Sequence, residues 1–118
     1  MKWTSLQDSK QLDEILAESK INPVLIYKHS TRCSISRTAF DRLERKWDSM
    51  VIGNIKNYYL DLISFRDISN RIAEMFQVEH QSPQILLIYN GKSVLDLSHY
   101  DIDFERIKTA CLAGGKDF

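Results

Sequence analysis

Cys33 is the residue in this sequence that is best placed for chemistry. It follows a short apolar run and a polar loop, and it lies at the first turn of a predicted helix. The first N–H groups of a helix have no partner within the helix, and the helix carries partial positive charge there. Both effects favour a thiolate, which is the nucleophile of sulfur chemistry, over a thiol. The position therefore indicates a reactive cysteine, although a small thiol packed as a half-buried hydrophobe is the ordinary alternative.

Basic residues gather around Cys33 in the sequence. The segment from Tyr27 to Trp47 holds six Lys or Arg against two acids, in a chain whose 16 basic and 16 acidic residues balance. The six are Lys28, Arg32, Arg37, Arg42, Arg45 and Lys46. They could bind an anionic substrate, tune the thiol or form a solvated helix face. His29 could raise the thiolate population or cap the loop.

The other cysteine and histidines do not form a second recognisable site. Cys111 shares the apolar side of a predicted C-terminal helix with Phe104 and Ile107, so we expect it in the core. His80 and His99 fall in polar loops. No Cys or His pair has the short spacing of a structural zinc site, and two cysteines are few for a disulfide-stapled secreted domain. The sequence therefore offers one candidate nucleophile.

Length and composition restrict the other classes of function. The chain has 118 residues, 43% hydrophobic and 27% charged, which suits a single domain over 1–118 with one core. Zero net charge argues against a general nucleic-acid or membrane-surface binder. No apolar run is long enough to span a bilayer, and no apolar run follows the N-terminal lysine as in a signal peptide. These features predict a cytoplasmic protein.

Alternating helices and strands are predicted to position Cys33. Capping boxes at Ser5 with Asp8 and at Ser64 with Asp67 precede apolar residues at helical spacing. The predicted helices run to about residue 18, over 33–48, after residue 64 to about 76, and from 102 or 103 to about 112. The predicted strands are the apolar runs 24–27, 58–60, 85–89 and 94–97.

The order of these elements predicts an α/β fold. Helical crossovers make the first strands parallel, and a hairpin turn at Asn90-Gly91 adds an antiparallel edge. Residues 2–4 leave a further edge strand undecided.

This arrangement resembles the thioredoxin superfamily over essentially the whole chain. In that superfamily a C-x-x-C or C-x-x-S motif follows a strand and opens a helix, as Cys33-Ser34-Ile35-Ser36 does here. The resemblance implies a thioredoxin-like fold, with a central mixed sheet, an antiparallel hairpin edge and flanking helices. It also implies that Pro83 is a cis-proline and that the backbone of Ser82 pairs with an incoming peptide. A trans proline that begins an edge strand is the alternative.

The motif His-Ser-Thr-Arg-Cys-Ser-Ile-Ser is more closely similar to the YtxJ-type monothiol bacilliredoxins, whose motif is typically Thr-Cys-Pro-Ile-Ser. The resemblance implies that Cys33 is the nucleophile and that Ser36 occupies the position of a resolving cysteine. There Ser36 could donate a hydroxyl hydrogen bond but could not resolve a disulfide. Two departures stand out: Arg32 is inserted before the cysteine, and Ser34 replaces the proline, which leaves the first helical turn less rigid.

The implied reaction is the reduction of mixed disulfides between protein cysteines and bacillithiol. The implied partners are bacillithiolated client proteins and a low-molecular-weight thiol, with bacillithiol as co-substrate, no other cofactor and no metal. Bacillithiol carries a malate moiety with two carboxylates, which Arg32 and Lys28 could bind. Two alternatives stay open. One is a glutathione-linked monothiol glutaredoxin-like enzyme, and the other is a non-catalytic thioredoxin-fold binding module.

Overall fold

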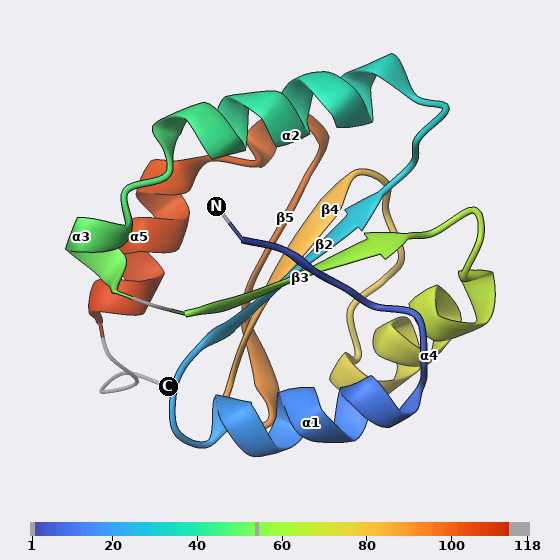
Figure 1. Cartoon of the computed structure of the whole chain (residues 1–118), viewed down its shortest axis with the longest axis horizontal. Coiled ribbons are helices and arrows are strands. Elements are labelled where there is room, and N and C mark those ends of the chain that lie inside the picture. The colour runs from blue at the N-terminus through green and yellow to red at the C-terminus, as the bar shows by residue number, and fades with distance from the viewer. Residues whose placement is uncertain (1, 54, 114–118) are drawn as a thin grey trace.

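A computed structural model describes residues 2–53 and 55–113, and these form a five-stranded sheet in the order β1-β3-β2-β4-β5 (Figure 1). The strands are β1 (Thr4–Ser5), β2 (Val24–His29), β3 (Lys56–Asp61), β4 (Gln84–Tyr89) and β5 (Lys92–Ser98). The first three are parallel, and β4 runs antiparallel to both β2 and β5. The α/β fold and its mixed sheet are therefore as predicted.

Helices cover both faces of this sheet. They are α1 (Lys10–Ser19), α2 (Ser34–Lys46), α3 (Ser49–Ile52), α4 (Arg66–Phe76), α5 (Phe104–Leu112) and the 3-10 helix η1 (His99–Asp101). Figure 1 shows α1 and α4 on one face, and α2, α3 and α5 on the other. Along β2, Ile26 belongs to the first core cluster and Tyr27 to the second. A strand covered on both faces is apolar throughout, which is why this segment reads as a continuous run.

Both predicted capping boxes are wrong. Ser5 lies in β1, where it pairs with Tyr59, so strand pairing removes it from the helix that follows. Helix α1 begins at Lys10, whose N–H donates to the Asp8 carboxylate at 2.9 Å. Helix α4 begins at Arg66, and its cap makes no side-chain hydrogen bond. The residues that precede each helix therefore form local turns rather than reciprocal caps.

The helix predicted over 33–48 differs from the structure at its C-terminal end. Helix α2 ends at Lys46, and a separate short helix, α3, follows it. The Asp48 carboxylate caps α3 by accepting a hydrogen bond from the Met50 N–H at 3.0 Å.

The hairpin turn between β4 and β5 is as predicted, since Asn90 and Gly91 both have positive φ, at 53° and 77°. That conformation matches the type I′ turns that favour Asn-Gly.

The sheet register places the end of β2 beside the start of β4. In the β2–β4 pair, Lys28 lies opposite Gln84, so the next residues outward are His29 and Pro83. The β2–α2 loop continues from His29 toward Cys33, and Figure 1 shows β4 beginning beside the end of β2. The candidate nucleophile and Ser82-Pro83 therefore lie at the same end of these two central strands.

Candidate active site around Cys33

Cys33 is the N-cap residue of α2 and is held there by its backbone. It has an extended conformation, with φ −109° and ψ 120°. Its N–H donates to the Ser30 carbonyl at 3.1 Å, and its carbonyl accepts from the Arg37 N–H at 3.1 Å. The side chain is half-buried and makes no capping hydrogen bond. The thiol therefore lies partly accessible at the positive end of a 13-residue helix.

Ser36 lies one turn further along α2, and its hydroxyl is hydrogen-bonded to two residues. The side chain is completely buried. Its Oγ lies 2.5 Å from His29 Nδ1 and accepts from the Ser30 N–H at 3.1 Å. The Tyr27 hydroxyl donates to the Ser36 carbonyl at 3.0 Å. The hydrogen bonds of the Ser36 hydroxyl therefore go to His29 at the end of β2 and to Ser30 in the loop that follows.

His29 is a buried residue of the same network. Its pKa is lowered first by burial and then by the positive charge of Arg37, so the imidazole is neutral at pH 7. Because the Ser36 oxygen already accepts the Ser30 N–H, its own proton is available to Nδ1 of that neutral ring. His29 therefore fixes the loop and the first turn of α2, which is the second of the two roles considered for it.

An aromatic cluster that the sequence analysis did not identify lies beside His29. The ring centroids of Tyr27, Phe40 and Tyr59 are 5.9, 5.5 and 5.3 Å from the imidazole. Trp3 packs on Phe40 at 5.1 Å, and its Nε1 donates to the Glu44 carboxylate at 3.2 Å. Tyr27 and Tyr59 are register partners on adjacent strands, which is the one signal that could have placed them together.

The basic cluster of the sequence separates in space. Arg32 is exposed next to Cys33, and Arg37 lies one turn into α2, paired loosely with Asp41 at 3.6 Å. Arg42 instead donates to the Ile102 carbonyl at 3.0 Å, and Arg45 and Lys46 lie at the far end of the helix. Arg32 and Arg37 are the basic residues of the cluster that remain near the thiol.

Lys28 does not join Arg32, as the expected binding of carboxylates would require. Strand alternation places it on the face of β2 opposite to His29, and it is fully buried. Its Nζ lies 3.4 Å from the Ser69 carbonyl and 3.4 Å from His80 Nδ1. Burial lowers the pKa of Lys28 to about 8. Because every residue of β2 is buried, polar and apolar residues do not alternate along it. The sequence therefore gives no sign of the face on which the Lys28 side chain lies.

The Ser82–Pro83 peptide bond is cis, as predicted. Pro83 is buried, and its carbonyl accepts from the His99 N–H at 2.9 Å. Ser82 is half-buried and lies two residues before β4. Cys111, by contrast, packs against the core cluster that includes Ile107, and burial raises its pKa to about 11. It lies near the end of α5, against α3 and away from the first turn of α2.

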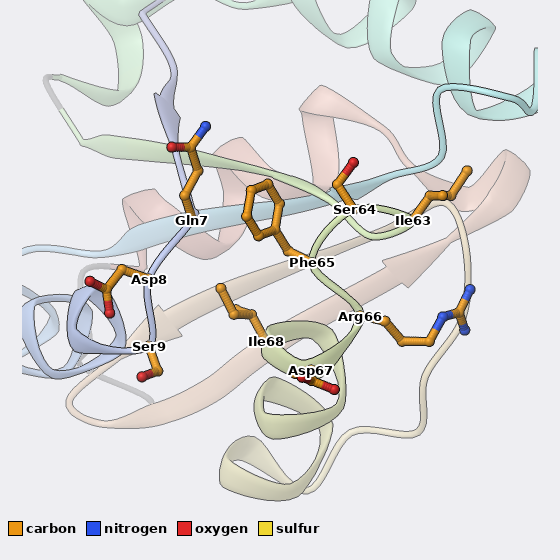
Figure 2. Close-up of a pocket in the computed structure, with 9 residues that line it drawn as sticks. All are labelled: Gln7, Asp8, Ser9, Ile63, Ser64, Phe65, Arg66, Asp67 and Ile68. Carbon is orange, nitrogen blue, oxygen red and sulfur yellow. The ribbon is translucent and has the colours of Figure 1, made fainter.

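A separate pocket of about 460 Å³ opens between the β1–α1 and β3–α4 connections (Figure 2). Its lining residues are Gln7, Asp8, Ser9, Ile63, Ser64, Phe65, Arg66, Asp67 and Ile68. Neither the Cys33–Ser36 turn nor Ser82-Pro83 contributes to it, and Figure 2 shows Arg66 turned away from Gln7 and Ser9. Over residues 2–53 and 55–113, no three His, Cys, Asp or Glu side chains gather as metal ligands, and no helix could cross a membrane.

Solved structures share this fold. One match, a protein described as an oxidoreductase with a thioredoxin fold, has a TM-score of 0.75 and 31% identity over 92% of each chain. The thioredoxins of Malassezia sympodialis and Trypanosoma brucei brucei each match at a TM-score of 0.69 and 15% identity. Those matches cover 94% and 96% of this chain and 89% and 92% of theirs. The chain is thus a thioredoxin-fold protein.

The family described as monothiol bacilliredoxin BrxC matches residues 4–107. This span includes both Cys33–Ser36 and Ser82-Pro83. The protein therefore belongs to the monothiol bacilliredoxin family, and its role as a thiol oxidoreductase agrees with the prediction from the sequence.

We predict that Ser36→Ala lowers the free energy of unfolding by about 1–3 kcal/mol, because it leaves the buried His29 Nδ1 and the half-buried Ser30 N–H without this partner. Urea denaturation measures the change. Ser34→Ala is the matched control, since Ser34 is exposed in the same helical turn, and it should change stability by less than about 0.5 kcal/mol. Equal stability of the two variants would contradict the account of the Ser36 network.

We predict that Lys28→Met raises the free energy of unfolding at pH 7 by about 1–3 kcal/mol, because the folded protein buries an ammonium group whose pKa is lowered to about 8. From pH 8 to 10 the unfolded chain still binds the proton that the folded chain has lost. The wild type therefore gains stability over that range, and its difference from Lys28→Met narrows. Urea denaturation of both proteins at several pH values tests this, and a widening difference would contradict it.

Proposed function

We propose that this protein removes bacillithiol from protein mixed disulfides by monothiol exchange at Cys33. The single observation that carries the proposal is that no thiol is present one turn after Cys33, where Ser36 stands. This serine is buried, and its hydroxyl is bound to His29 and Ser30. The other cysteine, Cys111, lies against α3 with a raised pKa. Neither position supplies a second thiol to resolve a disulfide formed at Cys33.

The proposed reaction has two exchange steps. The Cys33 thiolate attacks the bacillithiol sulfur of the mixed disulfide, a new Cys33–bacillithiol disulfide forms, and the client protein leaves as a thiolate. The thiolate of a second bacillithiol then attacks the bacillithiol sulfur of that adduct. Bacillithiol disulfide is released, and Cys33 is free again. The second bacillithiol is the reductant, so two bacillithiol molecules leave as one disulfide for each client thiol restored.

The surroundings of Cys33 suit the two halves of this substrate. Arg32 is exposed beside the thiol, and Arg37 is close enough for its charge to lower the pKa of His29. These two guanidinium groups supply positive charge for the carboxylates of the malate moiety, a role that the buried Lys28 cannot share. We propose that the backbone of Ser82 pairs with the client polypeptide. Two free cysteines also suit a reducing compartment, so we place the reaction in the cytoplasm.

The adducts formed with small disulfides test the nucleophile and the class of thiol. Wild type, Cys33→Ser and Cys111→Ser are incubated with bacillithiol disulfide or with glutathione disulfide, and intact masses are measured. We expect one bacillithiol adduct on wild type and on Cys111→Ser, and none on Cys33→Ser. A glutathione adduct alone would retain the exchange chemistry and contradict the choice of thiol. Adduction at Cys111, or at neither cysteine, would favour a non-catalytic binding module.

The proposed contribution of charge is tested by arginine substitutions. Arg32→Ala and Arg37→Ala should each slow adduct formation with bacillithiol disulfide about three- to tenfold at low ionic strength, and by less in high salt, because exposed charges are screened. Arg45→Ala is the matched control from the exposed far end of α2 and should have no effect. An equal slowing with the uncharged hydroxyethyl disulfide would contradict recognition of the carboxylates.

A further inference from the structure

A buried polar pair interrupts an otherwise apolar face of the sheet. Lys28 in β2 and Gln84 in β4 are direct register partners, so their side chains stand on the same face, under α1 and α4. Lys28 is 0% exposed and Gln84 1% exposed. Their neighbours on this face, Ile26 and Leu86, belong to the hydrophobic core. Burying an ammonium group and an amide there costs free energy, so stability does not explain the pair.

The hydrogen bonds of this pair converge on three consecutive residues. The Gln84 side chain accepts from the Gln81 N–H at 3.4 Å and donates to the Glu79 carbonyl at 3.0 Å. The Lys28 Nζ lies 3.4 Å from Nδ1 of His80, the residue between them. Glu79 to Gln81 are thereby held from the sheet through both the backbone and the central side chain.

His80 is prepared to accept the hydrogen bond from Lys28. Burial and the positive charges of Lys28 and Arg66 lower its pKa, so the ring is neutral near pH 7 and Nδ1 can act as an acceptor. The Ser69 hydroxyl also lies 3.3 Å from Nδ1, and the Ser69 carbonyl lies 3.4 Å from the Lys28 Nζ. Lys28, Ser69 and His80 thus join β2, α4 and the α4–β4 loop.

The segment held in this way leads directly into Ser82 and the cis Pro83. On the other side of Ser82, Pro83 is fixed to His99 by its carbonyl, at 2.9 Å. The backbone of Ser82 is therefore placed between two anchored points.

We propose that Lys28 and Gln84 are positioning residues, which hold the 79–81 segment so that Ser82 can pair with the protein half of a mixed disulfide. This inference rests on the proposed function, because it concerns the client polypeptide at the same site. Neither side chain takes part in the exchange at Cys33. Their contribution is a loop that is already ordered when the client arrives, which reduces the entropy lost on binding.

Kinetics with two substrates test this role in Lys28→Met and Gln84→Met. The first substrate is a bacillithiolated protein, which is followed in the steady state with bacillithiol as the reductant. The second is bacillithiol disulfide, which has no polypeptide and gives no net turnover with bacillithiol, so the rate of adduct formation at Cys33 is measured. We expect each variant to raise KM for the protein substrate about tenfold, the effect of losing one or two buried hydrogen bonds, and to leave kcat within about twofold. The rate with bacillithiol disulfide should not change. A general loss of structure would instead lower the rates with both substrates.

Two further substitutions make the comparison specific. Ser19→Ala is the matched control, because the buried Ser19 hydroxyl anchors the Gly91 N–H at the opposite end of β4, at 3.0 Å. It should leave KM for the protein substrate and the rate of adduct formation with bacillithiol disulfide unchanged. His80→Leu removes the acceptor and should raise KM for the protein substrate as Lys28→Met does. His80→Asn retains an acceptor and should restore most of the affinity.

Hydrogen exchange separates failure of this inference from failure of the proposed function. The amides of residues 80–82 should exchange about tenfold faster in Lys28→Met and Gln84→Met than in wild type, and at the wild-type rate in Ser19→Ala. An unchanged KM in an active series, or equal losses with both substrates, would overturn the inference. If wild type neither removes bacillithiol from the protein substrate nor forms an adduct with bacillithiol disulfide, the proposed function fails. Unchanged amide exchange in the two variants would overturn the positioning role independently.

Discussion

The arrangement of the site depends on one hydrogen-bonded serine. The Ser36 hydroxyl joins His29 at the end of β2 to the first turn of α2, and it also accepts the Ser30 N–H of the intervening loop. This contact fixes the path of the chain on both sides of Cys33, so the thiol is held at the helix terminus without a capping hydrogen bond from its own side chain. The same contact commits the position at which a dithiol enzyme would carry its second cysteine. One serine therefore orders the loop through its hydroxyl and leaves Cys33 as the thiol of the Cys33–Ser36 turn.

Those parts of the fold that rest on local chemistry could be predicted from the sequence. Three features are recognisable from a few neighbouring residues: Cys33 after an apolar strand, Pro83 before another, and Asn90-Gly91 in a hairpin turn. The predicted cap at Ser5 failed because its pairing with Tyr59 is a long-range contact that local spacing does not reveal. The cap at Ser64 failed because its hydroxyl donates to the Asp61 carboxylate at 3.0 Å instead.

The orientation of Lys28 was beyond the sequence for a related reason. Because β2 is buried on both faces, its residues do not alternate between apolar and polar, and the face on which each side chain lies is set by the register with β3 and β4. The aromatic cluster beside His29 depends on the same register. It unites side chains from residue 3 to residue 59, which no local pattern connects. Cys33, Ser36 and His29 could thus be named as candidate site residues from the sequence, whereas the orientation of Lys28 and the aromatic cluster could not be predicted.

The proposed function requires that Cys33 takes bacillithiol from a client protein and does not resolve the adduct by itself. A single-turnover reaction of stoichiometric wild-type protein with a bacillithiolated protein, without free bacillithiol, tests this most directly by intact mass. We expect the client to lose one bacillithiol while this protein gains one, and the adduct to persist until bacillithiol is added. Transfer onto Cys111, a covalent complex between Cys33 and the client, or no transfer at all would contradict it.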